Sequence, residues 1–156
     1  MVSFPSFPSR DNPKLQVWKE FLKNELNHFK PDIVVCHSLA NILWFHTCDE
    51  LDIKLDKLML VAPVSRNRTI EEAKTFFPYP IAKDLKAKEI IMAASTNDPY
   101  MSIEEAIELQ SKLNIGMKIM EDAGHINAAS GFGKLDCALD WIKRVDECQI
   151  NEELVK

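Results

Sequence analysis

The sequence has few glycines, no long apolar segment and no secretion signal. Only 4 of its 156 residues are glycine, and none precedes Gly116. No apolar run approaches the roughly 20 residues that a helix needs to cross a bilayer. Residues Met1 to Arg10 lack the charged-then-apolar pattern of a signal peptide. We therefore expect a cytoplasmic protein without a membrane partner.

The four cysteines show no C-x-x-C spacing. Without a secretion signal, they are typical of reduced thiols. The pairs Cys36-His37 and His46-x-Cys48 could suggest a metal site. However, adjacent residues on a strand point to opposite faces, and no second pair has the spacing of metal ligands. We expect neither a metal nor another cofactor.

Basic residues are too few for a partner that carries many phosphates. The formal net charge is −5, whereas nucleic acids and anionic membranes call for a basic face. The only basic cluster, Arg66-Asn67-Arg68, is short and is interpreted as a solvated loop. The length of 156 residues is that of one domain. We place this domain at residues 1–147 and a polar tail at residues 148–156.

Apolar runs and helix-start signals alternate along the chain. Asn12-Pro13 predicts a helix start, because asparagine favours the cap position and proline the first helical position. Ser102 and Glu105 form the pattern of a capping box. The expected helices are Pro13–Phe29, Leu39–Cys48, Ser102–Leu113 and Leu135–Val145, with a short helix within Thr69–Phe77. The expected strands are Ile33–Cys36, Lys57–Ala62, Glu89–Ser95 and Met117–Met120.

Strands that alternate with helices predict an α/β fold with a mostly parallel sheet covered on both faces, a three-layer αβα sandwich. Functional loops in such folds lie beyond the carboxyl ends of the strands. Ser38, Asp98 and His125 each follow one of the expected strands at that edge. The sequence therefore predicts that a nucleophile, an acid and a base gather at one edge of the sheet.

These three residue types form a catalytic triad when they meet in space. A histidine can remove the proton of a serine hydroxyl, and a buried carboxylate holds the imidazole in the required tautomer. The chain order Ser38, Asp98, His125 is that of α/β-hydrolases. Each residue also has a structural interpretation. Ser38 could be a helix cap, Asp98 part of an Asn-Asp-Pro turn, and His125 a loop residue without a role.

Ser38 also stands where a nucleophile elbow belongs, between a buried strand and a buried helix. An elbow usually reads G-x-S-x-G, because its sharp turn and close packing need small neighbours. Residues 36–40 read C-H-S-L-A here, so a small thiol and a methyl group replace the two glycines. The motif is weak by itself, and the hypothesis depends on the three residues together.

Three segments resemble the small serine hydrolases related to retinoblastoma-binding protein 9 and the YdeN-type bacterial proteins. Ser95–Tyr100 is similar to the acid loop of this family, and Ala123–Gly133 is similar to its histidine loop. Cys36–Leu39 matches the G-H-S-L elbow of the family except at the glycine. The L-x-C-x-E motif that binds retinoblastoma protein is absent, so that partner is not expected.

This resemblance implies a minimal α/β-hydrolase core that needs no cofactor. It implies that Ser38 is the nucleophile, Asp98 the acid and His125 the base. It further implies that the backbone N–H of Leu39 contributes to the oxyanion hole. The substrates that it implies are carboxylic esters.

The segment before Ser38 is shorter than the resemblance requires, because only 37 residues precede this serine. In the family another strand comes first, and its His-Gly loop supplies a second oxyanion-hole amide. We therefore expect an N-terminally truncated core in which strand Ile33–Cys36 has an unusual neighbour. That neighbour is an open edge, a replacement strand from Met1–Phe7, or a strand from a second copy of the chain. An open edge would favour homo-oligomers.

The leading hypothesis is a serine hydrolase that acts on small carboxylic esters through an acyl-enzyme intermediate. Loss of one oxyanion donor costs about 10²–10³ in kcat. The second hypothesis is therefore a catalytically impaired or inactive remnant of the fold that acts as a binding protein. A third is a thioesterase or an amidase that uses the same triad.

Overall fold

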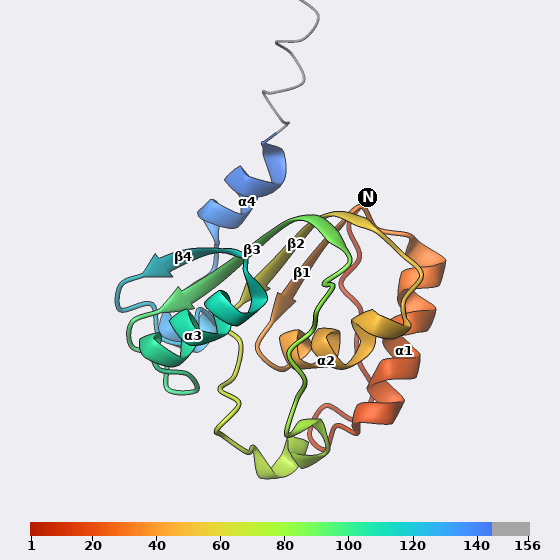
Figure 1. Cartoon of the computed structure of the whole chain (residues 1–156), viewed down its shortest axis with the longest axis horizontal. Helices are drawn as coiled ribbons and strands as arrows, with labels where there is room; N and C mark the ends of the chain where they lie inside the picture. Colours follow the sequence, from red (N-terminus) through yellow and green to blue (C-terminus); the bar gives the residue numbers. More distant parts are fainter. Residues whose placement is uncertain (145–156) are drawn as a thin grey trace, which may run out of the picture.

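The computed structural model describes residues 1–144 and contains a sheet of four parallel strands (Figure 1). The strands are neighbours in chain order: β1 (Ile33–His37), β2 (Leu55–Val61), β3 (Ala87–Ser95) and β4 (Gly116–Met120). All four strands predicted from the sequence are present. The expected polar tail, the domain end at residue 147 and the end of the helix expected to reach Val145 lie outside the described residues.

One face of the sheet carries the larger hydrophobic core. The helices α1 (Leu15–Phe29), α2 (Leu39–Thr47) and α3 (Ile103–Leu113) contribute to this core. α2 is apolar on most sides, so its burial is nearly complete. Its buried apolar side chains are Ile42, Leu43, Trp44 and Phe45.

The opposite face is covered by α4 (Asp136–Lys143) and by the loop that follows β4. Met59 and Val61 of β2 form a second buried cluster with Trp141 of α4. The Lys57 ammonium donates a hydrogen bond of 2.8 Å to the carbonyl oxygen of Trp141, which ties α4 to β2. Helices therefore lie on both faces, which confirms the predicted three layers. None of the helices within residues 1–144 is long and apolar enough to cross a membrane.

The start of α1 differs from the prediction. Asn12 does not cap the helix, which begins at Leu15 after Lys14. The backbone N–H of Leu15 instead donates to the hydroxyl of Thr75, at 3.0 Å. A distant side chain therefore replaces the local cap. The predicted capping box at α3 is present, with Ser102 and Glu105 bonded reciprocally, and the short helix expected within Thr69–Phe77 is the 3₁₀ helix η2 (Glu71–Phe76).

β1 lies at an edge of the sheet and pairs only with β2 among the described residues. Met1–Phe7 forms no strand, so the replacement strand, one of the three expected alternatives, is not present. The backbone N–H of Ser38 donates to the carbonyl oxygen of Val61, and the backbone N–H of Asp56 donates to the carbonyl oxygen of Asp32. Asp32 and Ser38 therefore direct their backbone groups toward β2. Alternate residues of a strand direct their backbone groups to opposite sides. The backbone groups of Ile33, Val35 and His37 therefore face the open edge.

Candidate active site

Ser38 occupies the sharp turn between β1 and α2. Its backbone lies at φ 54° and ψ −121°, a conformation that is costly for a residue with a side chain. The Ser38 N–H donates to the carbonyl oxygen of Val61 at 3.0 Å, which anchors the turn to the neighbouring strand. This geometry is that of a nucleophile elbow, which presents the serine hydroxyl beyond the sheet edge.

Asn41 holds this turn in place, a role that no local pattern in the sequence indicated. Its side-chain amide is fully buried and donates to two carbonyl oxygens, that of Ser38 at 2.9 Å and that of Val61 at 2.8 Å. Its Oδ1 atom is buried and has no hydrogen-bond partner among residues 1–144. Through these two hydrogen bonds, Asn41 connects the elbow residue Ser38 to the end of β2.

The structure brings together Ser38, Asp98 and His125, which lie 27 or more residues apart in the chain. His125 Nε2 is 2.8 Å from Ser38 Oγ, and His125 Nδ1 is 2.9 and 3.0 Å from the two oxygens of Asp98. An ionised carboxylate only accepts hydrogen bonds, so Nδ1 carries the proton and Nε2 accepts from the serine hydroxyl. The expectation that His125 reaches both partners is therefore confirmed, whereas the catalytic roles stay predictions.

The acid and the base are both shielded from water. Only 8% of the His125 side chain and 3% of the Asp98 side chain are exposed. Asp98 also accepts a hydrogen bond of 2.8 Å from the backbone N–H of Tyr100, as in an ordinary Asx turn. The two interpretations of Asp98 are therefore compatible, since the turn orients the carboxylate that contacts His125.

The loop that carries His125 is fixed to the acid loop by side chains from the end of β3. Asn97 Oδ1 accepts from the backbone N–H of Gly124 at 2.7 Å, and Ser95 Oγ accepts from that of Ala123 at 3.0 Å. Ser130 Oγ accepts from the N–H of His125 itself, at 3.0 Å. These polar residues lie within the two motifs that carry the family resemblance, and their contacts explain why those motifs are long.

Gly124 meets a steric requirement in this loop. Its φ is +55°, in the left-handed region that favours glycine, and a Cβ at this position would lie 2.5 Å from Ser130 Oγ. The close approach of Ser130 is the same contact that holds the backbone of His125. A glycine immediately before the base is therefore needed for its position.

His37, directly before Ser38, makes a further contact with the base. Its Nε2 donates to the carbonyl oxygen of His125 over 3.0 Å. Burial lowers the pKa of His37 from its usual value, so its neutral form is favoured. Burial also raises the pKa of the Cys36 thiol to about 12, so Cys36 is an unreactive neighbour of the elbow.

Leu39 is the first residue of α2, so its backbone N–H has no intrahelical acceptor. That N–H is therefore free to bind an oxyanion, and its role in the oxyanion hole stays a prediction. Within the described part of the chain, no group of three or more histidines, cysteines or acidic residues is placed to hold a metal ion.

The sequence profile of a family described as serine hydrolase matches residues 7–144. The chain belongs to this serine hydrolase family. The match spans most of the chain and includes all three residues of the proposed triad. The family membership predicted from the three motifs is therefore confirmed.

Solved structures with the same fold include a protein described as a YdeN-like hydrolase from Pectobacterium atrosepticum. It is 25% identical with a TM-score of 0.68, and the match covers 84% of this chain and 68% of that one. The ydeN gene product of B. subtilis is 19% identical with a TM-score of 0.68, over 88% of this chain and 78% of that one.

An esterase domain from a Rhodothermus marinus protein is 12% identical with a TM-score of 0.55. That match covers 81% of this chain and 66% of the other. At such identities, the B. subtilis and R. marinus structures show the fold alone. A comparison with curated protein sequences found no match. The serine hydrolase family and the α/β-hydrolase fold together establish a hydrolase-type chain.

Proposed function

We propose that this chain hydrolyses small carboxylic esters, with Ser38 as the nucleophile and His125 as the general base. The observation that carries the proposal is the continuous hydrogen-bond chain from Asp98 through His125 to Ser38. Its tautomer is the one that leaves Nε2 ready to accept the serine proton. Membership of the serine hydrolase family supports this assignment.

In the first half of the proposed reaction, Ser38 Oγ attacks the ester carbonyl carbon while its proton passes to His125 Nε2. Asp98 stabilises the resulting imidazolium through Nδ1. The tetrahedral intermediate then expels the alcohol, which receives the proton from Nε2. An acyl group remains on Ser38 Oγ.

In the second half, a water molecule attacks the acyl carbon and gives one proton to His125 Nε2. The second tetrahedral intermediate releases the carboxylic acid, and the proton returns to Ser38 Oγ. The backbone N–H of Leu39 is one donor to the oxyanion in both halves. Each such donor is worth about 10²–10³ in kcat.

The second candidate function is that of a binding protein that turns over little or no substrate. Among the described residues, the open edge of β1 leaves backbone groups beside Ser38 without a partner strand, and this favours the second candidate. The second oxyanion donor of related enzymes was expected from a strand at this position. A thioesterase or amidase would use the same triad, and substrate panels distinguish these from an esterase.

A fluorophosphonate probe tests the proposal, because it reacts only with an activated serine. We expect rapid labelling of the wild-type chain and none of Ser38→Ala. Ser111→Ala is the matched control, since Ser111 lies exposed on α3, away from the triad, and it should label like wild type. Equal labelling of Ser38→Ala would show that the nucleophile is misassigned, and no labelling of wild type would favour the binding protein.

A further inference from the structure

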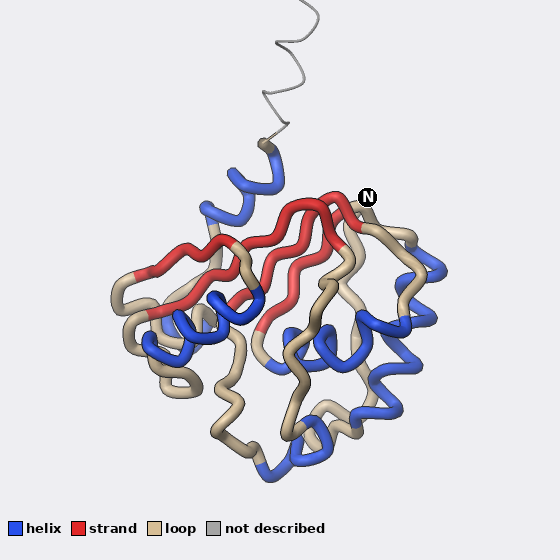
Figure 2. The backbone as a smooth tube through the Cα atoms, in the orientation of Figure 1, coloured by secondary structure: helices blue, strands red, loops and turns tan. Residues whose placement is uncertain are grey.

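A cavity of about 260 Å³ has Tyr100 in its lining, and the Tyr100 ring contacts that of His125. Arg68 of the connection after β2, Pro99 and Tyr100 of the segment between β3 and α3, and Glu105 of α3 are among the residues that line it. Both segments leave the carboxyl edge of the sheet, the edge at which Ser38 and His125 also lie. Figure 2 shows the long connection between β2 and β3 extending beyond that edge.

Tyr100 connects the cavity to the base. Its ring centroid is 4.5 Å from that of His125, with the rings tilted at 51°. Its backbone N–H also donates to Asp98, so its position is fixed relative to the acid. A substrate in contact with this wall of the cavity therefore lies close to the reacting atoms.

Arg68 supplies a positive charge at the same wall. Its guanidinium lies over the Tyr100 ring, 5.1 Å from the centroid, and its Nη1 donates to the carbonyl oxygen of Pro99. These two contacts hold the side chain in the cavity. The guanidinium has five N–H donors, and within residues 1–144 no carboxylate forms an ion pair with it. Most of its donors are therefore available to a ligand.

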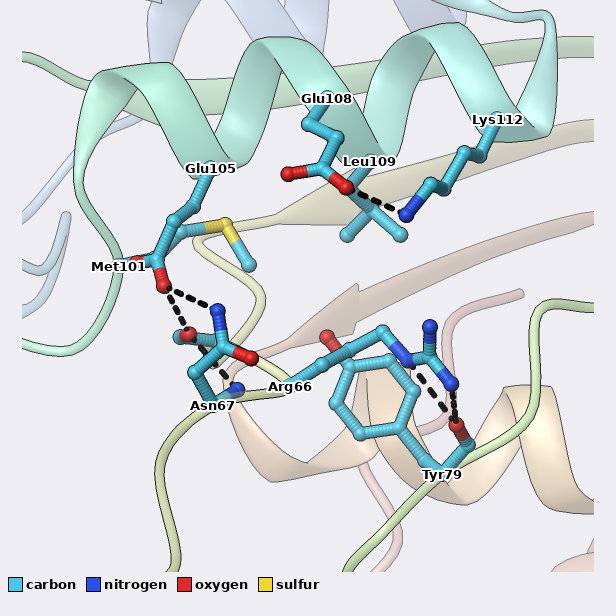
Figure 3. A pocket seen from close by; sticks show the side chains of 9 residues that line it. Arg66, Asn67, Tyr79, Met101, Glu105, Glu108, Leu109 and Lys112 are labelled. Atoms are coloured by element: carbon cyan, nitrogen blue, oxygen red, sulfur yellow. Dashed lines mark hydrogen bonds and ion pairs between the residues drawn. The ribbon is translucent and has the colours of Figure 1, made fainter.

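Glu105 is the acidic residue of the cavity, and its oxygens are already engaged. Ser65 Oγ donates to it at 2.6 Å, Asn67 Nδ2 at 3.0 Å and the backbone N–H of Ser102 at 3.1 Å. Figure 3 shows its carboxylate directed toward Asn67. The hydrogen bond from Ser65 lowers the pKa of Glu105, so it stays ionised. Its hydrogen bonds are internal to the loop, and its charge interacts with that of Arg68 without a direct ion pair among residues 1–144.

We infer that the cavity selects esters carrying a second, ionised carboxylate, which Arg68 binds through its free N–H groups. Arginine presents paired N–H groups that match a carboxylate. Tyr100 places this contact next to His125, so a substrate with a short chain between its two acid groups reaches both Arg68 and Ser38. This inference rests on the proposed esterase activity and names the substrate class of that site.

The test compares two esters that differ only in charge, the monoethyl ester of glutaric acid and its primary amide analogue. We expect kcat/KM to favour the charged ester by about tenfold or more, the worth of one charge-assisted contact. Arg68→Gln should abolish that preference, and added salt should weaken it. The acetate ester of hydroxybutyric acid and its amide test whether the carboxylate belongs to the alcohol side instead.

Arg66→Gln is the matched control. Arg66 belongs to the same loop, but its Nε and Nη2 atoms both donate to the carbonyl oxygen of Tyr79, as Figure 3 shows. It lines a smaller neighbouring cavity of about 60 Å³. We expect this variant to keep the wild-type preference for the charged ester. If Arg66→Gln and Arg68→Gln lost the preference for the charged ester equally, the preference would be a general charge effect, and the inference would be overturned.

A binding experiment with glutarate tests the carboxylate site independently of the proposed esterase activity. NMR titration should shift the backbone signals of Arg68 and Tyr100 in wild type, and Arg68→Gln should weaken the affinity by about tenfold. Esterase activity without charge preference, together with no such shifts, would refute the carboxylate site and leave the hydrolase intact. Glutarate binding without labelling of Ser38 by the fluorophosphonate would refute the hydrolase and leave the site.

Discussion

The backbone of Ser38 has a costly conformation, and the side chain of Asn41 stabilises it through hydrogen bonds. Removal of the Asn41 amide eliminates a buried hydrogen bond to Val61 and a partly buried one to Ser38. We predict that Asn41→Ala lowers the free energy of unfolding by about 1–3 kcal/mol. The turn should also relax, so that fluorophosphonate labelling of Ser38 slows. Urea unfolding and labelling kinetics measure the two effects, and wild-type values for both would exclude a supporting role for Asn41.

His37 should make the stability of the fold depend on pH. Burial lowers its pKa in the folded state, so below about pH 6.5 the unfolded chain binds more protons than the folded chain. The stabilising contribution of neutral His37 is therefore present above that pH and is lost as the pH falls. His37→Gln keeps an N–H donor for the His125 carbonyl oxygen but does not titrate.

We predict that, between about pH 7.5 and pH 5.5, wild type loses more unfolding free energy than His37→Gln. Denaturant unfolding at several pH values measures this difference. Parallel curves for the two proteins would contradict the expected pKa shift of His37. The donor that glutamine retains makes this variant a better comparison than an apolar replacement.

At the scale of elements, the histidine loop depends on one glycine. Gly124→Ala would add a Cβ at a positive φ, 2.5 Å from Ser130 Oγ. We predict a loss of about 1–3 kcal/mol in unfolding free energy and slower labelling of Ser38, because the strain displaces His125. Gly133→Ala is the control, since a Cβ there meets nothing within 4 Å. Equal effects of the two substitutions would show that the loop tolerates the displacement.

The elements could be predicted because their signals are local. Each strand is a short apolar run, and Ser102 with Glu105 forms a capping box within one turn of helix. The start of α1 could not be predicted, because Thr75, 60 residues away, satisfies the N–H of Leu15. The same reason applies to Asn41 of α2, whose acceptor Val61 lies 20 residues away on β2. Sequence spacing indicated which residues share the sheet edge, but not these long-range contacts.

At the scale of the whole molecule, β1 presents an open sheet edge among residues 1–144. The backbone groups that face outward at this edge belong to Ile33, Val35 and His37. If β1 pairs antiparallel with β1 of a second copy about a two-fold axis at Val35, each outward group meets a partner on the other copy. Val35 is 46% exposed, so its apolar side chain is available for contact beside the paired backbones. We propose that the chain forms dimers through this edge.

We predict that the oligomeric fraction rises with protein concentration and that Val35→Lys shifts it toward the monomer, because a charged edge opposes pairing. Ile107→Lys is the matched control, since Ile107 is 47% exposed on α3, which packs against β3. Light scattering coupled to gel filtration measures the mass of each protein. A monomeric wild type at high concentration would contradict the pairing.

The central claim is that Ser38, activated by His125, forms a covalent acyl intermediate. Its most direct test is mass spectrometry of the chain quenched during turnover of p-nitrophenyl acetate. We predict an acetyl group on the peptide that contains Ser38 in wild type. In His125→Gln that acetyl group should be absent, with turnover lower by roughly 10³-fold or more. Turnover without acetylation of Ser38, or acetylation that persists in His125→Gln, would contradict the claim.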